Sequence, residues 1–162
     1  MTCRILVLNG PNLGHLGQRQ PHIYGTQGMR DLPDLVETLM GQAVDEVELL
    51  FFQANGEGQI IDRLEQAHRE SVHGVALNAG AYTHTSLALA DCLAWIDPPC
   101  VEVHLSNILA RSESMRHVSL IAPQCIGVIS GFGLLSYALA IQTLWLRWTT
   151  SMADQSESST QL

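Results

Sequence analysis

GVALNAGAYTHTSLALADCLAWI, residues 74–96, shows the alternation from which the fold class can be predicted. Its first part, 74–80, is a short apolar run typical of a buried β-strand, and the apolar spacing of 84–96 is typical of a covered helix. Hydroxyl and imidazole side chains lie between the two parts, where the strand gives way to the helix. A strand followed in this way by a helix is the repeating unit of a parallel sheet.

The same alternation runs along most of the chain. It predicts further strands at 3–9, 47–53, 100–106 and 126–131, and further helices at 31–43, 56–70 and 134–148. Units of this spacing predict an α/β fold with helices on both faces of a five-stranded parallel sheet, a three-layer sandwich. Right-handed crossovers and the chain length favour the doubly wound, flavodoxin-like order 2-1-3-4-5. We expect one domain over 1–149 and a disordered polar tail over 150–162.

Charge and composition limit the partners of the chain. A formal net charge of −8 disfavours binding to nucleic acid and to anionic membranes. No apolar run approaches the roughly 18 residues that a membrane span needs, and the N-terminal sequence enters a strand without the pattern of a signal peptide. We therefore expect a cytoplasmic protein that has neither nucleic acid nor membrane as a partner.

The reactive residue types narrow the chemistry further. All 8 basic residues are Arg, which excludes a Lys Schiff base and a P-loop and gives each Arg more weight as a candidate ligand of anions. The cysteines form no C-x-x-C pair, and we expect them to be buried free thiols. They are Cys3, Cys92, Cys100 and Cys125.

Unusual polar segments follow three of the predicted strands. They are NGPNLGHLGQRQPHIYG (9–25), NAGAYTHTS (78–86) and HLSN (104–107). In open α/β sheets, ligands bind beyond the carboxyl ends of the strands, at the point where the strand order reverses. We therefore expect the three segments to meet at one crevice.

Two pairs of side chains in these segments suggest proton transfer. A phenol such as Tyr24 is a weak base at neutral pH, but a neighbouring guanidinium, such as that of Arg19, favours the phenolate. Glu102 and His104 are two positions apart on a strand, so they point to the same face, where the carboxylate would favour a protonated imidazole and His104 could act as a general acid. The alternatives are a surface role for Arg19 and Tyr24 and a purely structural Glu–His pair.

Other residues leave several classes of function open. Asn78 and His84 add polar groups to the crevice, and the hydroxyls near His84 can cap the following helix, whose N-terminus attracts anions. His84 and His104 could ligate zinc, but no two His lie three or four apart on a predicted helix, so no metal is expected. This chain lacks the acidic residues and the Lys that a phospho-acceptor module needs. It also lacks the hydroxyl-rich loop that an FMN carrier needs. A non-catalytic module that binds a small anionic ligand remains the alternative to an enzyme.

Four motifs in register carry a resemblance to a known family. NGPNLGHLGQRQPHIYG, FFQANGEG, NAGAYTHTS and VEVHLSN have the order and spacing of type II 3-dehydroquinate dehydratases, and the chain resembles this family from residue 4 to about 148. The resemblance implies a cofactor-free hydro-lyase of the shikimate pathway, which makes aromatic amino acids. It would convert 3-dehydroquinate, a small anionic substrate, into 3-dehydroshikimate, and it would assemble as a homododecamer, a tetramer of trimers.

The resemblance also implies catalytic roles. Tyr24 would be the tyrosinate base that takes a proton from carbon 2, next to the ketone, and Arg19 would hold it ionised. Asn12 would orient a water that stabilises the enolate. His104, paired with Glu102, would donate a proton to the departing hydroxyl.

Further residues would bind the substrate, by the same resemblance. The backbone at Leu105 and Ser106 would hold the carboxylate of the substrate. The side chains of Asn78, His84 and Arg116 would hold its hydroxyls. The carboxylate of Asp91 would reach into the site of a neighbouring subunit.

The chain departs from the family pattern in a few places. Gln20 stands where the family usually has Glu, and Gly56 where it often has His. The largest departure is LARSESMRHVSL, 109–120, which carries one extra residue between Arg111 and Arg116, and also has Met115 in place of Phe and Leu120 in place of Tyr. A displaced Arg116 would weaken substrate binding before it weakened the chemistry.

Overall fold

The structure, a computed structural model, describes residues 1–16 and 28–160. In this part of the chain one parallel sheet has the order β2-β1-β3-β4-β5, which confirms the predicted doubly wound topology. The strands are β1 (Cys3–Asn9), β2 (Val47–Gln53), β3 (Gly74–Asn78), β4 (Cys100–His104) and β5 (Gly127–Ser130).

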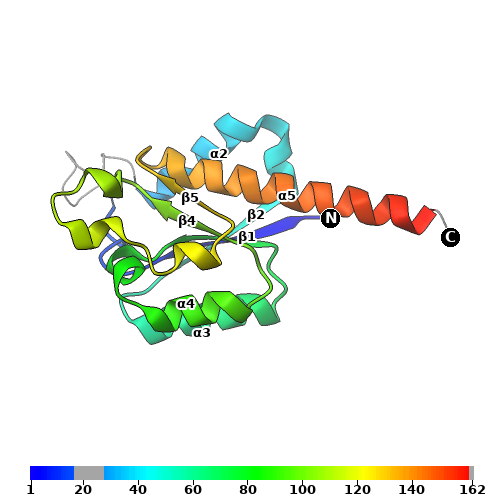
Figure 1. Cartoon of the computed structure of the whole chain (residues 1–162). Helices are drawn as coiled ribbons and strands as arrows, with labels where there is room; N and C mark the ends of the chain where they lie inside the picture. The colour runs from blue at the N-terminus through cyan, green and yellow to red at the C-terminus, as the bar shows by residue number, and fades with distance from the viewer. Residues whose placement is uncertain (17–27, 161–162) are drawn as a thin grey trace.

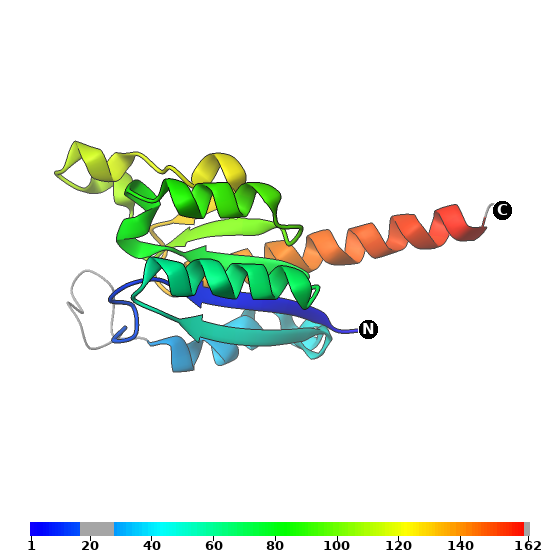
Figure 2. The same ribbon diagram turned by 90° about the horizontal axis from the view of Figure 1, so that it is seen from below.

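Helices cover both faces of the sheet (Figures 1 and 2). α2 (Leu32–Met40) and α5 (Leu135–Thr160) lie on one face, and α3 (Glu57–Arg69) and α4 (Leu87–Trp95) lie on the other. Strand residues alternate between two cores: Ile5 and Val7 pack toward α2 and α5, whereas Leu6 and Leu8 pack toward α3 and α4. Burial on both faces explains why β1 and β3 are continuous apolar runs in the sequence.

Short 3₁₀ helices occupy the connections. They are η1 (Met29–Asp31), η2 (Gly41–Glu46), η3 (Gly80–His84), η4 (Ile108–Ala110), η5 (Ser114–His117) and η6 (Ala122–Gln124). The helix predicted over 84–96 therefore begins later, at Leu87, where the hydroxyl of Ser86 accepts a hydrogen bond from the Leu89 N–H at 2.9 Å. This N-cap confirms the capping role expected of a hydroxyl in this segment.

The C-terminal helix is longer than the sequence predicted. A disordered tail was expected from residue 150, but α5 continues to Thr160 and extends beyond the sheet (Figures 1 and 2). No Gly or Pro interrupts α5, and the hydroxyls of Thr149, Thr150 and Ser151 donate to carbonyls three or four residues earlier in the same helix. The segment after residue 148 has no apolar face, so apolar periodicity could not predict that the helix continues. The domain boundary at residue 149 stays a prediction. No helix in the described ranges is long and apolar enough to span a membrane.

The cysteines are free thiols, as predicted. Cys3, Cys92 and Cys100 are buried, whereas Cys125 is partly exposed. Burial, with a smaller effect of nearby glutamates, raises the pKa of Cys3 to about 12 and that of Cys92 to about 11. These two thiols are therefore neutral and unreactive at physiological pH.

His73, which precedes β3, should make the stability of the fold depend on pH. Its Nδ1 accepts a hydrogen bond from the Arg4 N–H at 2.8 Å, which a ring protonated at Nδ1 cannot do. Burial, and then the charge of Arg4, lower the pKa of His73 below its usual 6.5. As the pH falls, His73 is therefore protonated in the unfolded chain before it is protonated in the folded one. The contribution of neutral His73 to stability is complete above about pH 6.5 and is lost as the pH falls below that value.

The variant His73→Gln tests this pH dependence, since Gln offers an acceptor that does not titrate. We expect the melting temperature of the wild type to fall more steeply than that of the variant between about pH 7.5 and 5.5. Thermal unfolding followed by circular dichroism measures both curves, and parallel curves would contradict the assignment.

Candidate active site

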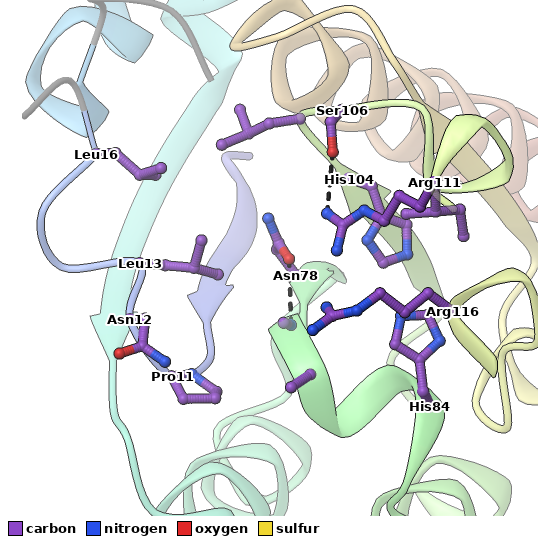
Figure 3. A pocket seen from close by; sticks show the side chains of 14 residues that line it. Pro11, Asn12, Leu13, Leu16, Asn78, His84, His104, Ser106, Arg111 and Arg116 are labelled. Carbon is purple, nitrogen blue, oxygen red and sulfur yellow. Dashed lines mark hydrogen bonds between the residues drawn. The ribbon is translucent and has the colours of Figure 1, made fainter. Parts of the chain in front are cut away.

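A cavity of about 170 Å³ lies beyond the carboxyl ends of β1, β3 and β4 (Figure 3). Its volume is below the roughly 300–1,000 Å³ typical of drug-sized ligands, which suits a small metabolite. All three segments that were expected to meet contribute to it. Its lining comprises Pro11, Asn12, Leu13, Leu16, Asn78, Gly80, Ala81, His84, His104, Leu105, Ser106, Ile108, Arg111 and Arg116.

Close packing of two loops forms one wall of the cavity. The Gly10 N–H donates to the Asn78 carbonyl at 2.8 Å, and a Cβ at residue 10 would lie 2.5 Å from the carbonyl oxygen of Ala79. The loop after β1 can therefore approach the loop after β3 only with Gly at this position. Asn12 follows with a φ of 65°, a left-handed conformation that Asn tolerates, and its N–H donates to the Asn55 side chain at 3.0 Å.

The predicted Glu–His pair is present at the end of β4. Nε2 of His104 lies 2.5 Å from Oε1 of Glu102, and the carboxylate is fully buried. Because Nε2 is bound to the carboxylate, Nδ1 is the ring nitrogen left for a ligand in the cavity. A buried carboxylate that accepts hydrogen bonds in this way stabilises positive charge on the imidazole, which suits a proton donor.

Ser119 completes this pair, although it was not among the predicted site residues. Its hydroxyl donates to Oε2 of Glu102 at 2.8 Å and accepts from the Ala122 N–H at 3.0 Å. The backbone N–H can only donate, so the serine proton must point to the carboxylate. The charge of Glu102 is thus shared between two donors. A single Ser in an irregular stretch, 17 residues from its partner, carries no sequence pattern that would reveal this contact.

The opposite wall of the cavity is cationic. The side chains of Arg111 and Arg116 both point toward Asn78 (Figure 3), and Nη2 of Arg111 donates to the Ser106 hydroxyl at 3.0 Å. Arg116 lies 3.9 Å from the Glu113 carboxylate. Arg116 therefore reaches the cavity in spite of the extra residue before it. Arg111 was not among the predicted ligands, although the absence of Lys had already given weight to every Arg.

His84 lies beside Arg116 in the same wall (Figure 3). Its Nδ1 is 2.6 Å from the Val118 carbonyl, so this nitrogen must carry the proton that is donated. In a neutral ring Nε2 is then an acceptor, suited to a ligand hydroxyl.

The structure brings together most of the predicted site residues that it describes. Asn12, Asn78, His84, His104, Leu105, Ser106 and Arg116 line the cavity, and Glu102 lies behind His104. Asp91 is exposed on α4 and does not line the cavity of its own chain. Arg19, Gln20 and Tyr24 lie outside the described residues. Among the described residues, no group of three His, Cys, Asp or Glu side chains could hold a metal ion.

Fold and site together define a class of protein. It is a flavodoxin-like α/β protein with a cationic cavity at the point where the strand order reverses. The cavity contains an imidazole that is bonded to a buried carboxylate.

Comparison with known proteins assigns the family. The family model described as "Dehydroquinase class II" matches residues 3–145, and the chain belongs to that family. It is 52% identical over 145 residues to the 3-dehydroquinate dehydratase of Exiguobacterium sp., an alignment that covers 90% of this chain and 96% of the relative. Identity to the enzyme of that name from Synechocystis sp. is 51%, covering 87% and 90%. The type II dehydroquinase structure from Butyrivibrio crossotus matches with a TM-score of 0.80 and 40% identity, covering 88% and 97%.

Proposed function

We propose that this chain eliminates water from 3-dehydroquinate to give 3-dehydroshikimate, through an enolate and without a cofactor. The observation that carries the proposal is the buried Glu102–His104 pair, whose second ring nitrogen is left for the cavity. Family membership supplies the substrate, since the relatives carry the name 3-dehydroquinate dehydratase.

The cationic wall favours an anionic substrate. The substrate carboxylate is proposed to lie against the backbone at Leu105 and Ser106, beside the guanidinium of Arg111, which is already bound to the Ser106 hydroxyl. Asn78, His84 and Arg116 would then hold the ring hydroxyls. The extended cation of Arg, with several donors, can serve carboxylate and hydroxyl oxygens together.

The elimination needs a base and an acid that act at two neighbouring carbons of the substrate. Tyr24, held ionised by Arg19, would take the proton from carbon 2. The electron pair of the broken C–H bond would move toward the ketone oxygen to give an enolate. A water oriented by Asn12 would stabilise that charge. The enolate would then reform the ketone, the electron pair would become the ring double bond, and the hydroxyl would leave with a proton from His104. The roles of Tyr24 and Arg19 rest on the resemblance.

Assembly as a homododecamer is part of the proposal. Large apolar side chains are exposed around the edge strand β5, where an unpaired strand would otherwise remain accessible. They are Leu109, Val118, Ile126, Val128 and Phe132. Asp91, exposed on α4, would reach a neighbouring subunit's cavity in such an assembly. The cytoplasmic location and the biosynthetic role stay predictions.

A direct assay tests the function. We expect the purified chain, with a chelator and no added cofactor, to convert 3-dehydroquinate into a product that absorbs as a conjugated enone, because the new double bond lies next to the ketone. If micromolar protein gave no product while calorimetry still showed binding of 3-dehydroquinate, the chain would be a binding module and not a dehydratase.

A further inference from the structure

A chain of three hydrogen bonds runs from the lining of the cavity into the core. The Gly80 N–H donates to Oδ1 of Asn78 at 3.2 Å, Nδ2 of Asn78 donates to the Tyr137 hydroxyl at 2.8 Å, and that hydroxyl donates to Oδ1 of Asn9 at 2.6 Å. Tyr137, on α5, is fully buried and does not line the cavity. The hydrogen bonds thus connect the ends of β1 and β3 to a helix residue that lies 128 positions after Asn9 and 59 positions after Asn78.

The direction of every bond in this chain follows from its first donor. The backbone N–H of Gly80 can only donate, so Asn78 must turn its oxygen toward Gly80 and its NH₂ group toward Tyr137. The phenol must then accept from Asn78, and its one proton is left for Asn9. Rotating the Asn78 amide by half a turn would place two donors face to face at Gly80, and it would break two bonds among buried groups.

The phenol is suited to this position because it stays neutral. Burial raises the pKa of Tyr137 far above its usual value, an effect that the hydrogen bond from Asn78 only partly opposes. The hydroxyl therefore keeps the proton that it donates to Asn9 over the whole physiological range.

We propose that Tyr137 is a positioning residue: its hydroxyl holds the Asn78 amide in the orientation that the Gly80 N–H sets, so that the second N–H of Nδ2 is kept in place for the cavity as a donor to a substrate oxygen. The inference rests on the proposed function and adds to it a residue outside the cavity that holds one substrate donor in place. Asn78 lies between the loop after β1 and the two arginines (Figure 3), where an oxygen of a bound ring would meet it. The contact is made to substrate and transition state alike, so its loss should affect binding more than chemistry.

The variant Tyr137→Phe tests the inference. We expect KM for 3-dehydroquinate to rise roughly 3–10-fold, the effect of one neutral hydrogen bond, while kcat stays within about twofold. In an Asn78→Ala background the same change should have no further effect on KM, because the amide through which Tyr137 acts is already gone. An unchanged KM, or additive effects in the double variant, would overturn the proposal.

Two further variants separate positioning from stability. Ala140→Gly lies at a buried position of the same helix and changes no polar contact; it should lower the melting temperature and leave KM unchanged. If Tyr137→Phe fails to fold, Asn9→Ala removes the acceptor of the phenol proton, and KM should rise without further effect in the Asn78→Ala background. A wild type that does not turn over 3-dehydroquinate would refute the proposed function, and this inference with it; an active wild type with an unchanged KM in the variants would refute the inference alone.

Discussion

Replacing His104 with Gln should lower kcat for the dehydration of 3-dehydroquinate by roughly 10²–10⁴-fold, the range of a lost general acid. Gln is close to His in size and can still hydrogen-bond to Glu102, but it cannot give a proton to the departing hydroxyl. KM should change little, because the cationic wall is intact. Steady-state kinetics measures both constants. The matched control is His73→Gln, a half-buried His at the opposite end of β3, which should keep its activity.

The carboxylate behind His104 should matter less than the imidazole itself. Glu102→Gln keeps the shape of the buried group and an acceptor for His104, but it removes the negative charge that stabilises the imidazolium. A charge-assisted hydrogen bond is worth about 1.5–3 kcal/mol, so we expect kcat to fall roughly 10–100-fold. An unchanged kcat in this variant, with the fold intact, would leave the pair a purely structural feature.

Tyr24→Phe should have the other large effect. Removing the phenol oxygen removes the proposed base and leaves no group that takes the proton from carbon 2, so kcat should fall by about 10³-fold or more. The role of Tyr24 rests on the family resemblance, and residue 24 lies outside the described residues, so this variant is the most direct test of that assignment.

The control for Tyr24→Phe is Tyr82→Phe. The Tyr82 hydroxyl donates to the Asn55 carbonyl at 3.0 Å, and Tyr82 does not line the cavity. This variant should keep kcat within a few-fold of the wild type. Turnover by Tyr24→Phe at the rate of its control would contradict the assignment of the base.

The fold and part of the site could be predicted because their signals are local. Alternating apolar strands and helices fix the doubly wound order through general rules of handedness and length. Glu102 and His104 were predicted as a pair because a strand sends residues i and i+2 to the same face, whatever the rest of the chain does. The meeting of three polar segments followed from the common direction of parallel strands.

The contacts that could not be predicted join residues far apart in the sequence. Ser119 bonds to Glu102 only because the irregular stretch before η6 folds back over β4, and Tyr137 reaches Asn9 across 128 positions. Ser119 belongs to no periodic pattern, and Tyr137 looks like any apolar residue of a covered helix. The length of α5 was underestimated for a different reason: its last residues have no apolar face, which is the feature from which helices are recognised in a sequence.

In the proposed mechanism, proton removal and departure of the hydroxyl are two steps that depend on separate residues. Exchange at carbon 2 of 3-dehydroquinate in D₂O, followed by NMR beside the formation of product, tests it most directly. His104→Gln should still exchange the carbon 2 proton for deuterium while it makes almost no 3-dehydroshikimate, and Tyr24→Phe should do neither above the rate without enzyme. If His104→Gln lost exchange and elimination to the same extent, or if Tyr24→Phe still exchanged at the wild-type rate, the division of roles would be contradicted.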